Sequence, residues 1–258
     1  MNIIGIIPAR MASSRFPGKP LVRIGDIPMI GHVYHRSRMS KILTGVYVTT
    51  CDRDIEEYMR STGGHAIMTS DRHERASDRA AEAMLKIEKE MGSKTDIVVM
   101  IQGDEPMLYP EMIDEAVKPM LADNSIQVVN LMALLKSREE QDDPHEVKVV
   151  CDLEGFALYF SREPIPSWKK GAKDVSMLKQ VCIIPFRRDF LVKFNEFTPT
   201  PLEKVESVDM LRVLEHGYRV KMVRSKYETY SVDTPADLNK VAMLMRKDRL
   251  VGLYAGRR

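Results

Sequence analysis

Cysteine is scarce in this 258-residue chain, and its three cysteines stand far apart. Cys51, Cys151 and Cys182 form no C-x-x-C pair, and the six histidines show no H-E-x-x-H spacing. This argues against the disulfide framework of small secreted proteins and against the common zinc motifs. The pattern is typical of the reducing cytoplasm, and we expect a cytoplasmic localisation.

Neither sign of charge dominates, and long apolar runs are also missing. The 39 lysines and arginines nearly balance the 37 acidic residues, which gives a net charge of +2. A chain so balanced has no overall basic field for nucleic acid or an anionic membrane. The N-terminal apolar run is too short for a signal peptide or a membrane span. We therefore expect neither nucleic acid nor a membrane as a partner.

The first half of the chain alternates short apolar runs, which predict strands, with segments that predict helices. The strands are expected at 3–7, 46–50, 65–68 and 96–101, and the helices at 28–40, 52–61 and 77–91. Asp52 and Ser77 could cap the second and third helices. This order predicts an α/β fold with a doubly wound, mostly parallel sheet, in a single domain over residues 1–258.

The pattern changes after a helix near 111–122. Strand-like segments become closely spaced, and Asp152 and Gly155 predict a turn that makes a hairpin instead of another crossover. The strands are expected at 127–134, 147–151, 156–160, 181–184 and 218–224, and the helices at 189–197, 207–216 and from 233 onwards. We interpret residues about 136–200 as a smaller lobe inserted into the domain.

The loop after the first strand carries three cations among small residues. Arg10, Arg15 and Lys19 stand within residues 8–21, and ligands of open parallel sheets bind outside the carboxyl ends of strands. Three positive charges there suit a polyanion such as a triphosphate. Pro20 stands where a Walker A loop has its hydroxyl residue, and the spaced glycines of a dinucleotide site are missing. A solvated basic loop is the alternative.

Two aspartates stand at the ends of expected elements. Asp104 follows the apolar strand 96–101, and Asp233 precedes Thr234-Pro235 at the start of the last helix. Asp104 could be a turn residue or a helix-initiating acid, and Asp233 could be an N-terminal cap. However, Mg²⁺ on a nucleotide is typically held by one or two carboxylates plus phosphate oxygens. The two aspartates could therefore converge on one metal.

Three motifs indicate a function more specifically than the charges of their residues do. They are Pro-Ala-Arg, Ser-Ser-Arg and Pro-Gly-Lys-Pro-Leu within 8–21, Gln-Gly-Asp-Glu-Pro at 102–106, and Val-Asp-Thr-Pro-x-Asp-Leu at 232–238. Together they resemble the 3-deoxy-manno-octulosonate cytidylyltransferase (CMP-Kdo synthetase) family, and the resemblance covers nearly the whole chain. It implies a Rossmann-like nucleotidyltransferase fold. The implied reaction transfers CMP from CTP to a Kdo-like 3-deoxy-2-ulosonic acid and releases pyrophosphate.

The resemblance also implies roles for individual residues. Those expected to be catalytic are Arg10, Lys19, Asp104 and Asp233, with both aspartates as ligands of Mg²⁺. Those expected to bind the nucleotide are Ala9, Arg10, Ser13, Arg15, Lys19, Ser77, Arg79 and Gln102. Those expected to bind the acidic sugar are Gln102, Arg162, Gln180, Glu203 and Glu206. Without the resemblance, Arg162 could equally be a surface cation after a strand. The inserted lobe would carry sugar contacts and much of a homodimer interface.

Departures from the family pattern concern the substrates. The nucleotide-reading loop, usually His-x-Ser-Gly-Thr-Glu-Arg, is here residues 73–79 with Arg-Ala in place of Ser-Gly. In the sugar-side segment Gln180 replaces a histidine and Ile184 a tyrosine, and Met210 replaces a glutamine on a nearby helix. These changes mark a divergent member whose acceptor could be an amino-deoxy Kdo, another acidic sugar or a phosphonate. A non-catalytic nucleotide-binding protein is the alternative of another class.

Overall fold

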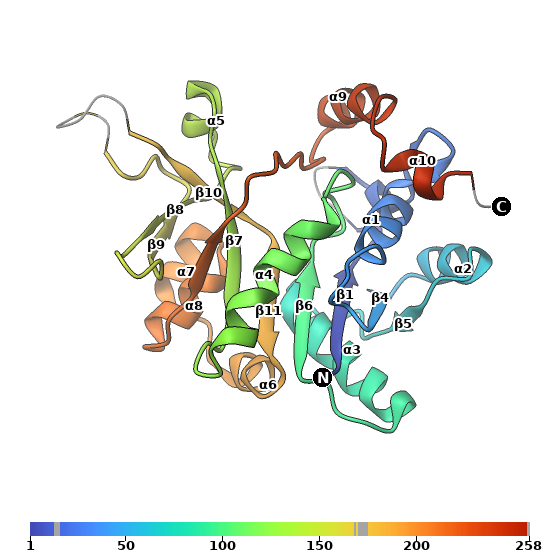
Figure 1. Cartoon of the computed structure of the whole chain (residues 1–258), viewed down its shortest axis with the longest axis horizontal. Coiled ribbons are helices and arrows are strands. Elements are labelled where there is room, and N and C mark those ends of the chain that lie inside the picture. Colours follow the sequence, from blue (N-terminus) through green and yellow to red (C-terminus); the bar gives the residue numbers. More distant parts are fainter. Residues whose placement is uncertain (13–15, 168, 170–174, 257–258) are drawn as a thin grey trace. The chain divides into compact units, whose positions relative to one another are not determined.

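The structure is a computed structural model that describes residues 1–12, 16–167, 169 and 175–256. The chain divides into two compact units (Figure 1). The first comprises residues 1–114 and 229–258, and the second comprises residues 115–228. The second unit is thus an insertion, and it extends beyond residues 136–200 on both sides. The roles expected for that lobe in sugar binding and dimerisation stay predictions.

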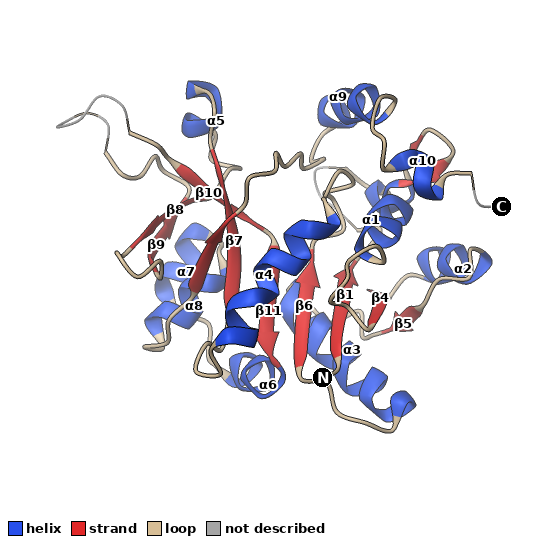
Figure 2. Ribbon diagram, viewed as in Figure 1, coloured by secondary structure: helices blue, strands red, loops and turns tan. Residues whose placement is uncertain are grey.

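The first unit contains a parallel sheet whose strands lie in the order β6, β1, β4, β5 (Figure 2). The strands are β1 Ile3–Pro8, β4 Gly45–Thr50, β5 Ala66–Met68 and β6 Ile97–Ile101. The helices between them are α1 Met29–Ser37, α2 Arg53–Ser61 and α3 Ala76–Met91. All four predicted strands and all three predicted helices of this part are confirmed within a few residues, and so is the α/β fold class.

The order of these strands places a topological switch between β1 and β6. From β1 the chain moves through β4 to β5, and it then returns to the other side of β1 as β6. Right-handed crossovers in opposite directions put α1 and α2 on one face of the sheet and α3 on the other. Loops at the carboxyl ends of β1 and β6 therefore flank a crevice of the kind that binds ligands in open α/β sheets.

Smaller elements complete the first unit. A one-turn 3₁₀ helix η1 Lys19–Leu21 leads into the hairpin of β2 Arg23–Ile24 and β3 Ile27–Pro28. The chain returns to this unit at residue 229 and ends in α9 Pro235–Met245 and α10 Val251–Tyr254 (Figure 1). Helix α4 Pro110–Ala122 begins in the first unit and ends in the second.

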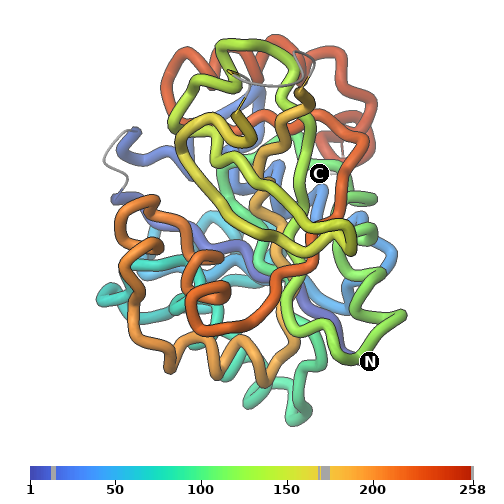
Figure 3. The backbone as a smooth tube through the Cα atoms, turned by 90° about the vertical axis from the view of Figure 1, so that its left-hand side faces the viewer, coloured from blue at the N-terminus to red at the C-terminus, as the bar shows by residue number. Residues whose placement is uncertain are grey.

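The second unit contains a mixed sheet in the order β12, β7, β10, β8, β9. The strands of this sheet are β7 Val129–Leu134, β8 Lys148–Cys151, β9 Ala157–Ser161, β10 Leu178–Val181 and β12 Lys221–Arg224, and the unit also contains the strand β11 Ile183–Arg187 outside this sheet. Its helices are α5 Arg138–Asp142, α6 Arg188–Glu196, α7 Pro201–Glu206 and α8 Asp209–Glu215. The backbone of this unit runs from green to orange in Figure 3. The predicted hairpin is confirmed: β8 and β9 are antiparallel, and the Gly155 N–H closes the turn on the Asp152 carbonyl.

Three predicted elements of the second unit need correction. The single strand expected at 181–184 is two strands, β10 and β11, on either side of Cys182. The helix expected at 207–216 begins only at Asp209, because Ser207 adopts a left-handed conformation, with φ of 52°, between α7 and α8. The strand expected at 218–224 begins only at Lys221.

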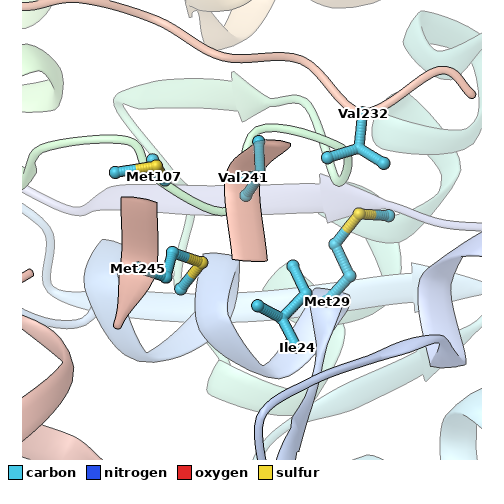
Figure 4. Close-up of a cluster of buried hydrophobic side chains, with 6 residues drawn as sticks. All are labelled: Ile24, Met29, Met107, Val232, Val241 and Met245. Carbon is cyan, nitrogen blue, oxygen red and sulfur yellow. The ribbon is translucent and has the colours of Figure 1, made fainter. Parts of the chain in front are cut away.

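An apolar cluster in the first unit joins the segments that carry the three sequence motifs within 8–21, at 102–106 and at 232–238 (Figure 4). Its buried members are Ile24, Met29, Met107, Val232, Val241 and Met245. These side chains come from the hairpin after η1, from α1, from the turn after β6 and from the segment that returns into α9. Burial of this apolar surface stabilises the approach of three segments that are far apart in the sequence.

Among the described residues, no helix is both long enough and apolar enough to cross a lipid bilayer.

Candidate active site

Hydrogen bonds join the two ends of the loop after β1 and hold it next to the segment that follows β4. The Met11 carbonyl accepts a hydrogen bond from the Gly18 N–H at 3.0 Å, and the Met11 N–H donates to Asp52 Oδ2 at 2.8 Å. Gly18 has a φ of 74°, which glycine adopts without the steric cost that a Cβ would bring. The chain then enters η1, so that Lys19 stands at the fixed end of the loop.

Lys19 joins the two predicted metal ligands. Its Nζ donates to Asp104 Oδ2 at 2.8 Å, to Asp233 Oδ1 at 3.2 Å and to the Val232 carbonyl at 2.8 Å. The three side chains are mostly buried, with exposed fractions of 12% for Lys19, 15% for Asp104 and 21% for Asp233. Residues separated by up to 214 positions in the chain thus meet around one ammonium group.

The backbone brings the two aspartates together. The Val232 N–H donates to the Asp104 carbonyl at 2.9 Å, and the Val232 side chain is buried in the apolar cluster described above. At the end of β6, a Cβ on Gly103 would lie 3.1 Å from the Pro8 carbonyl oxygen, so glycine permits close passage of β1. The carboxyl ends of β1 and β6 therefore deliver Lys19 and Asp104 to the same place.

The cap of α9 is not Asp233. Thr234 is the N-cap, and it forms a capping box with Asp237, whose side chain accepts from the Thr234 N–H while Thr234 Oγ1 accepts from the Asp237 N–H. The alternative that Asp233 is a helix cap is therefore wrong. Its carboxylate is directed to Lys19 instead.

The charges of this cluster suit a bound cation. Burial raises the pKa of the Asp104 carboxyl above its ordinary value, and the neighbouring Lys19 ammonium opposes this rise. Two carboxylate oxygens already bracket one positive charge, so their geometry fits a cation shared between them. Among the described residues no group of three or more His, Cys, Asp or Glu could hold a metal. A metal here would take its other ligands from phosphate oxygens and water.

Three other residues predicted to bind the nucleotide stand shortly before Lys19 or Asp104 in the sequence. Ala9 is buried just after β1, whereas the Arg10 side chain is exposed and has no partner among the described residues. Gln102 is exposed at the end of β6. Ser13 and Arg15 lie outside the described residues. The nucleotide contacts of all these residues stay predictions.

Ser77 and Arg79 belong to α3. Ser77 was expected to cap this helix, but Arg75 is the N-cap and Ser77 lies inside the first turn, fully buried. Arg79 is 3% exposed, and its guanidinium donates to Thr69 Oγ1 at 2.6 Å, just after the end of β5. The guanidinium is thus held at the carboxyl end of the sheet, where its predicted contact with the nucleotide stays open to test.

Arg162 and Glu206 form one network in the second unit. The Arg162 guanidinium donates to the backbone carbonyls of Glu206, Pro144 and Ser207 at 2.6, 2.7 and 3.3 Å. The Glu206 carboxylate accepts from the Arg162 N–H at 2.8 Å and from Ser161 Oγ at 3.1 Å. In this arrangement Arg162 braces the loop after β9, and its predicted contact with the carboxylate of a sugar stays a prediction.

Glu203 is fully buried and paired with Arg212. Arg212 Nε donates to Glu203 Oε2 at 2.7 Å, and its NH2 group donates to Oε1 at 2.6 Å, so the pair is bidentate. Removing one member of a buried ion pair costs about 3–5 kcal/mol. Glu203 therefore stabilises α7 against α8 in this structure, and its predicted sugar contact stays untested.

Gln180 is oriented by a neighbouring amide. The Asn130 Nδ2 group donates to the carbonyls of Leu131 and Val181, which turns its Oδ1 toward Gln180 Nε2 at 2.6 Å. The Gln180 Oε1 atom then has no partner among the described residues and remains an acceptor. Ile184 and Met210, the other two departures, are buried.

Sequence reasoning missed the roles of three supporting residues. Asp52 is the N-cap residue of α2, as expected, but its side chain makes no cap bond and instead accepts from the Met11 N–H in the loop after β1. Asn130 orients Gln180, and Arg212 neutralises Glu203. A lone asparagine in the apolar run 126–135 was the one available signal, since a buried amide needs partners.

Comparisons with known proteins agree with this geometry. The sequence model of the family described as cytidylyltransferase matches residues 4–226. The chain belongs to the cytidylyltransferase family. A member of this family is a nucleotidyltransferase, so the cluster around Lys19 lies in an enzyme.

Two relatives and one solved structure match almost the whole length of this chain. It is 44% identical to the 3-deoxy-manno-octulosonate cytidylyltransferase of Geobacter metallireducens over 93% of this chain and 96% of the relative. It is 38% identical to the enzyme of the same name from Solibacter usitatus over 99% of both chains. A structure of CMP:2-keto-3-deoxy-manno-octonic acid synthetase complexed with CTP has a TM-score of 0.88, at 38% identity over 96% of this chain and 99% of that chain.

Proposed function

We propose that this enzyme transfers CMP from CTP to Kdo or a closely related 3-deoxy-2-ulosonic acid. The observation that carries the proposal is the buried cluster of Lys19, Asp104 and Asp233 at the switch point of the sheet. Relatives named 3-deoxy-manno-octulosonate cytidylyltransferase, up to 44% identical, support the substrates. The related structure in complex with CTP supports CTP as the nucleotide.

The reaction requires positioning and charge stabilisation more than a covalent nucleophile. A hydroxyl oxygen of the acid forms a bond to the α-phosphorus of CTP, the bond to the bridging oxygen of pyrophosphate breaks, and the hydroxyl proton passes to solvent. Arg10 and Lys19 would bind the departing phosphates. Asp104 and Asp233 would hold Mg²⁺, which when bound supplies positive charge beside the α-phosphate.

An assay of pyrophosphate release tests this proposal. Wild-type enzyme should release pyrophosphate from CTP in the presence of Mg²⁺ and Kdo. The rate of release should be lower when ATP or GTP replaces CTP. Asp104→Asn and Asp233→Asn should each lower turnover on the order of a hundredfold or more, because they remove charge next to the reacting phosphate. Circular dichroism should show both variants folded. Full activity of either variant at limiting Mg²⁺ would remove that aspartate from the metal site.

One observation is compatible with a second acceptor. Gln180, where the family pattern has histidine, presents an oriented carbonyl oxygen and therefore takes a hydrogen-bond donor. A hydroxyl group or an ammonium group can satisfy it, so an amino-deoxy Kdo is the alternative substrate. The same assay with both acids decides between them through the ratio of kcat/KM.

Two accompanying expectations belong to the same proposal. We infer that the enzyme works in the cytoplasm, where cysteines stay reduced and CTP is available, and that it forms a homodimer. Fractionation of cells and light scattering of the purified protein test these two points. A non-catalytic nucleotide binder would bind CTP but release no pyrophosphate with any acid.

A further inference from the structure

The Lys19 ammonium group uses all of its donors inside the protein. A lysine ammonium has three N–H donors, and here they go to Asp104 Oδ2, Asp233 Oδ1 and the Val232 carbonyl. With 12% of its side chain exposed, Lys19 has no donor left for a phosphate oxygen in this arrangement. To bind a triphosphate as proposed above, the ammonium must leave at least one of these acceptors.

The same carboxylates are the proposed metal ligands, so the metal and the ammonium compete. Both are cations that bind carboxylate oxygens, and two cations so close together repel each other, most strongly where little water screens them. Without the ammonium, two carboxylates would face one another in a mostly buried place. Lys19 therefore offsets part of the negative charge of this pair when no metal is bound.

We propose that Lys19 is an internal counter-ion that occupies the metal position until a triphosphate draws its ammonium group away. The proposal rests on the proposed function, because it takes Asp104 and Asp233 as metal ligands and CTP as the nucleotide. The flexible four-carbon stem of lysine allows the ammonium to move while η1 holds its backbone. Each of the two ligands then strengthens the binding of the other, and the divalent ion binds poorly before the nucleotide.

Direct titration with Mn²⁺ in the absence of nucleotide tests this, with free Mn²⁺ followed by electron paramagnetic resonance. Lys19→Gln should bind Mn²⁺ about tenfold more tightly than wild type, a size typical of coupling between two sites. The matched control is Lys94→Gln, which removes one exposed positive charge. Lys94 precedes the first residue of β6, whereas Asp104 follows the last, so this change should leave Mn²⁺ affinity unchanged. Lys19→Arg retains the charge and should retain the weak binding.

The same Lys19→Gln variant should bind CTP about tenfold or more weakly, because it loses a charge-assisted hydrogen bond. Opposite changes for the two ligands are the signature of the proposal, since a merely structural lysine would not tighten metal binding. Lys19→Met, which keeps the apolar stem, is the second variant if Lys19→Gln does not fold, and it carries the same expectation.

Three results would overturn the proposal. The first is equal Mn²⁺ affinity of wild type and the folded Lys19 variant, even if CTP binding weakens, because Lys19 would then contact only phosphate. The second is an equal gain in Lys94→Gln. The third is a gain that persists when Asp104→Asn is added, because the metal would then bind elsewhere. Absence of pyrophosphate release by wild type would instead overturn the proposed function, and the Mn²⁺ titration would still report on Lys19.

Discussion

Arg10 differs from Lys19 of the same loop, because it has no partner among the described residues. Its side chain is exposed and free among the described residues, whereas Lys19 is buried between two carboxylates. The free energy of a charge-assisted hydrogen bond is about 1.5–3 kcal/mol. Arg10 can therefore give this energy to a ligand without first breaking an internal contact.

Arg10→Ala should weaken CTP binding about ten- to a hundredfold and leave the unfolding temperature unchanged, because the described part of the chain offers Arg10 no internal contact to lose. Isothermal titration with CTP measures the first effect and a thermal melt the second. Arg60→Ala, which removes an arginine whose side chain is 72% exposed, is the control. Equal CTP affinity of Arg10→Ala and Arg60→Ala would show that the loop arginine is only solvated.

Gln180 carries the prediction about the acceptor. Gln180→His introduces the residue of the family pattern, and it should raise kcat/KM for Kdo relative to the amino-deoxy analogue. The reason is that a site which pairs a polar group of one substrate rejects an analogue that lacks it. Gln141→His in α5 is the control, and the measurement is the ratio of kcat/KM for the two acids. An unchanged ratio would remove Gln180 from the choice of substrate.

Restoring the residue of the family pattern at the other two altered positions is less informative. Ile184 is 3% exposed and Met210 is fully buried, so Ile184→Tyr would overfill a packed space and Met210→Gln would bury an unpaired amide. Each change can cost about 1–3 kcal/mol of stability. Activity lost in these variants would report on folding as well as on substrate choice.

Among the elements, α1 takes part in the apolar cluster that holds the segments of the site together. Met29 at its start is fully buried in the cluster that also holds Val232, the neighbour of Asp233 (Figure 4). The cluster thus connects the hairpin after η1, the turn after β6 and the segment before α9. Shortening one of its side chains should disturb both stability and the alignment of Lys19 with the aspartates.

Met29→Ala should lower the free energy of unfolding by about 2–5 kcal/mol, the usual range for truncating a buried methionine. Met243→Ala is a matched control, because Met243 is 61% exposed on α9 and should change stability little. Urea denaturation of the two variants measures the difference. A loss below about 0.5 kcal/mol for Met29→Ala would mean that this cluster does not hold the segments together.

At the scale of the whole molecule, a buried histidine joins α1 to the C-terminal helix α10. His32 Nδ1 lies 2.8 Å from the Tyr254 hydroxyl, and Nε2 lies 2.9 Å from the Ile24 carbonyl oxygen. Burial lowers the pKa of His32 from 6.5 to about 4, helped by the charge of Arg36 and opposed by the hydrogen bond to Ile24. The imidazole is therefore neutral in the folded protein at neutral pH.

Stability should consequently fall on acidification. The unfolded chain takes up a proton at His32 near pH 6.5, whereas the folded chain does so only near pH 4. The stability that depends on a neutral His32 is therefore complete above pH 6.5 and is lost as the pH falls from 6.5 to 4. The total is about 3 kcal/mol, of which about 2 kcal/mol is lost by pH 5. Urea denaturation at pH 7.5 and pH 5 measures this loss. His32→Asn should remove this component of the loss, and His65→Asn, at an exposed position, should not. An identical decline in His32→Asn and wild type would assign the acid sensitivity to other groups.

The sequence by itself determined the alternation of strands and helices in the first unit and the motifs of the family. Buried parallel strands need nearly continuous apolar runs, and such runs can be recognised locally. The motif residues Lys19, Asp104 and Asp233 could be named for the same reason, because each follows or precedes a recognisable element. Boundaries that depend on a single backbone conformation, as at Ser207, could not be predicted from the local pattern.

Only the tertiary structure decided which partners these residues have. Asp233 looked like a helix cap, yet it faces Lys19, and Asp52 stands at the N-cap of α2 with its side chain bonded to the loop after β1. Glu203 looked available to a ligand, yet Arg212 neutralises it in the interior. Local pattern gives the type and order of elements, whereas a side chain's partner depends on which distant segments pack beside it. That choice is made by burial of apolar surface across the whole chain, and here it placed one ammonium group between two carboxylates.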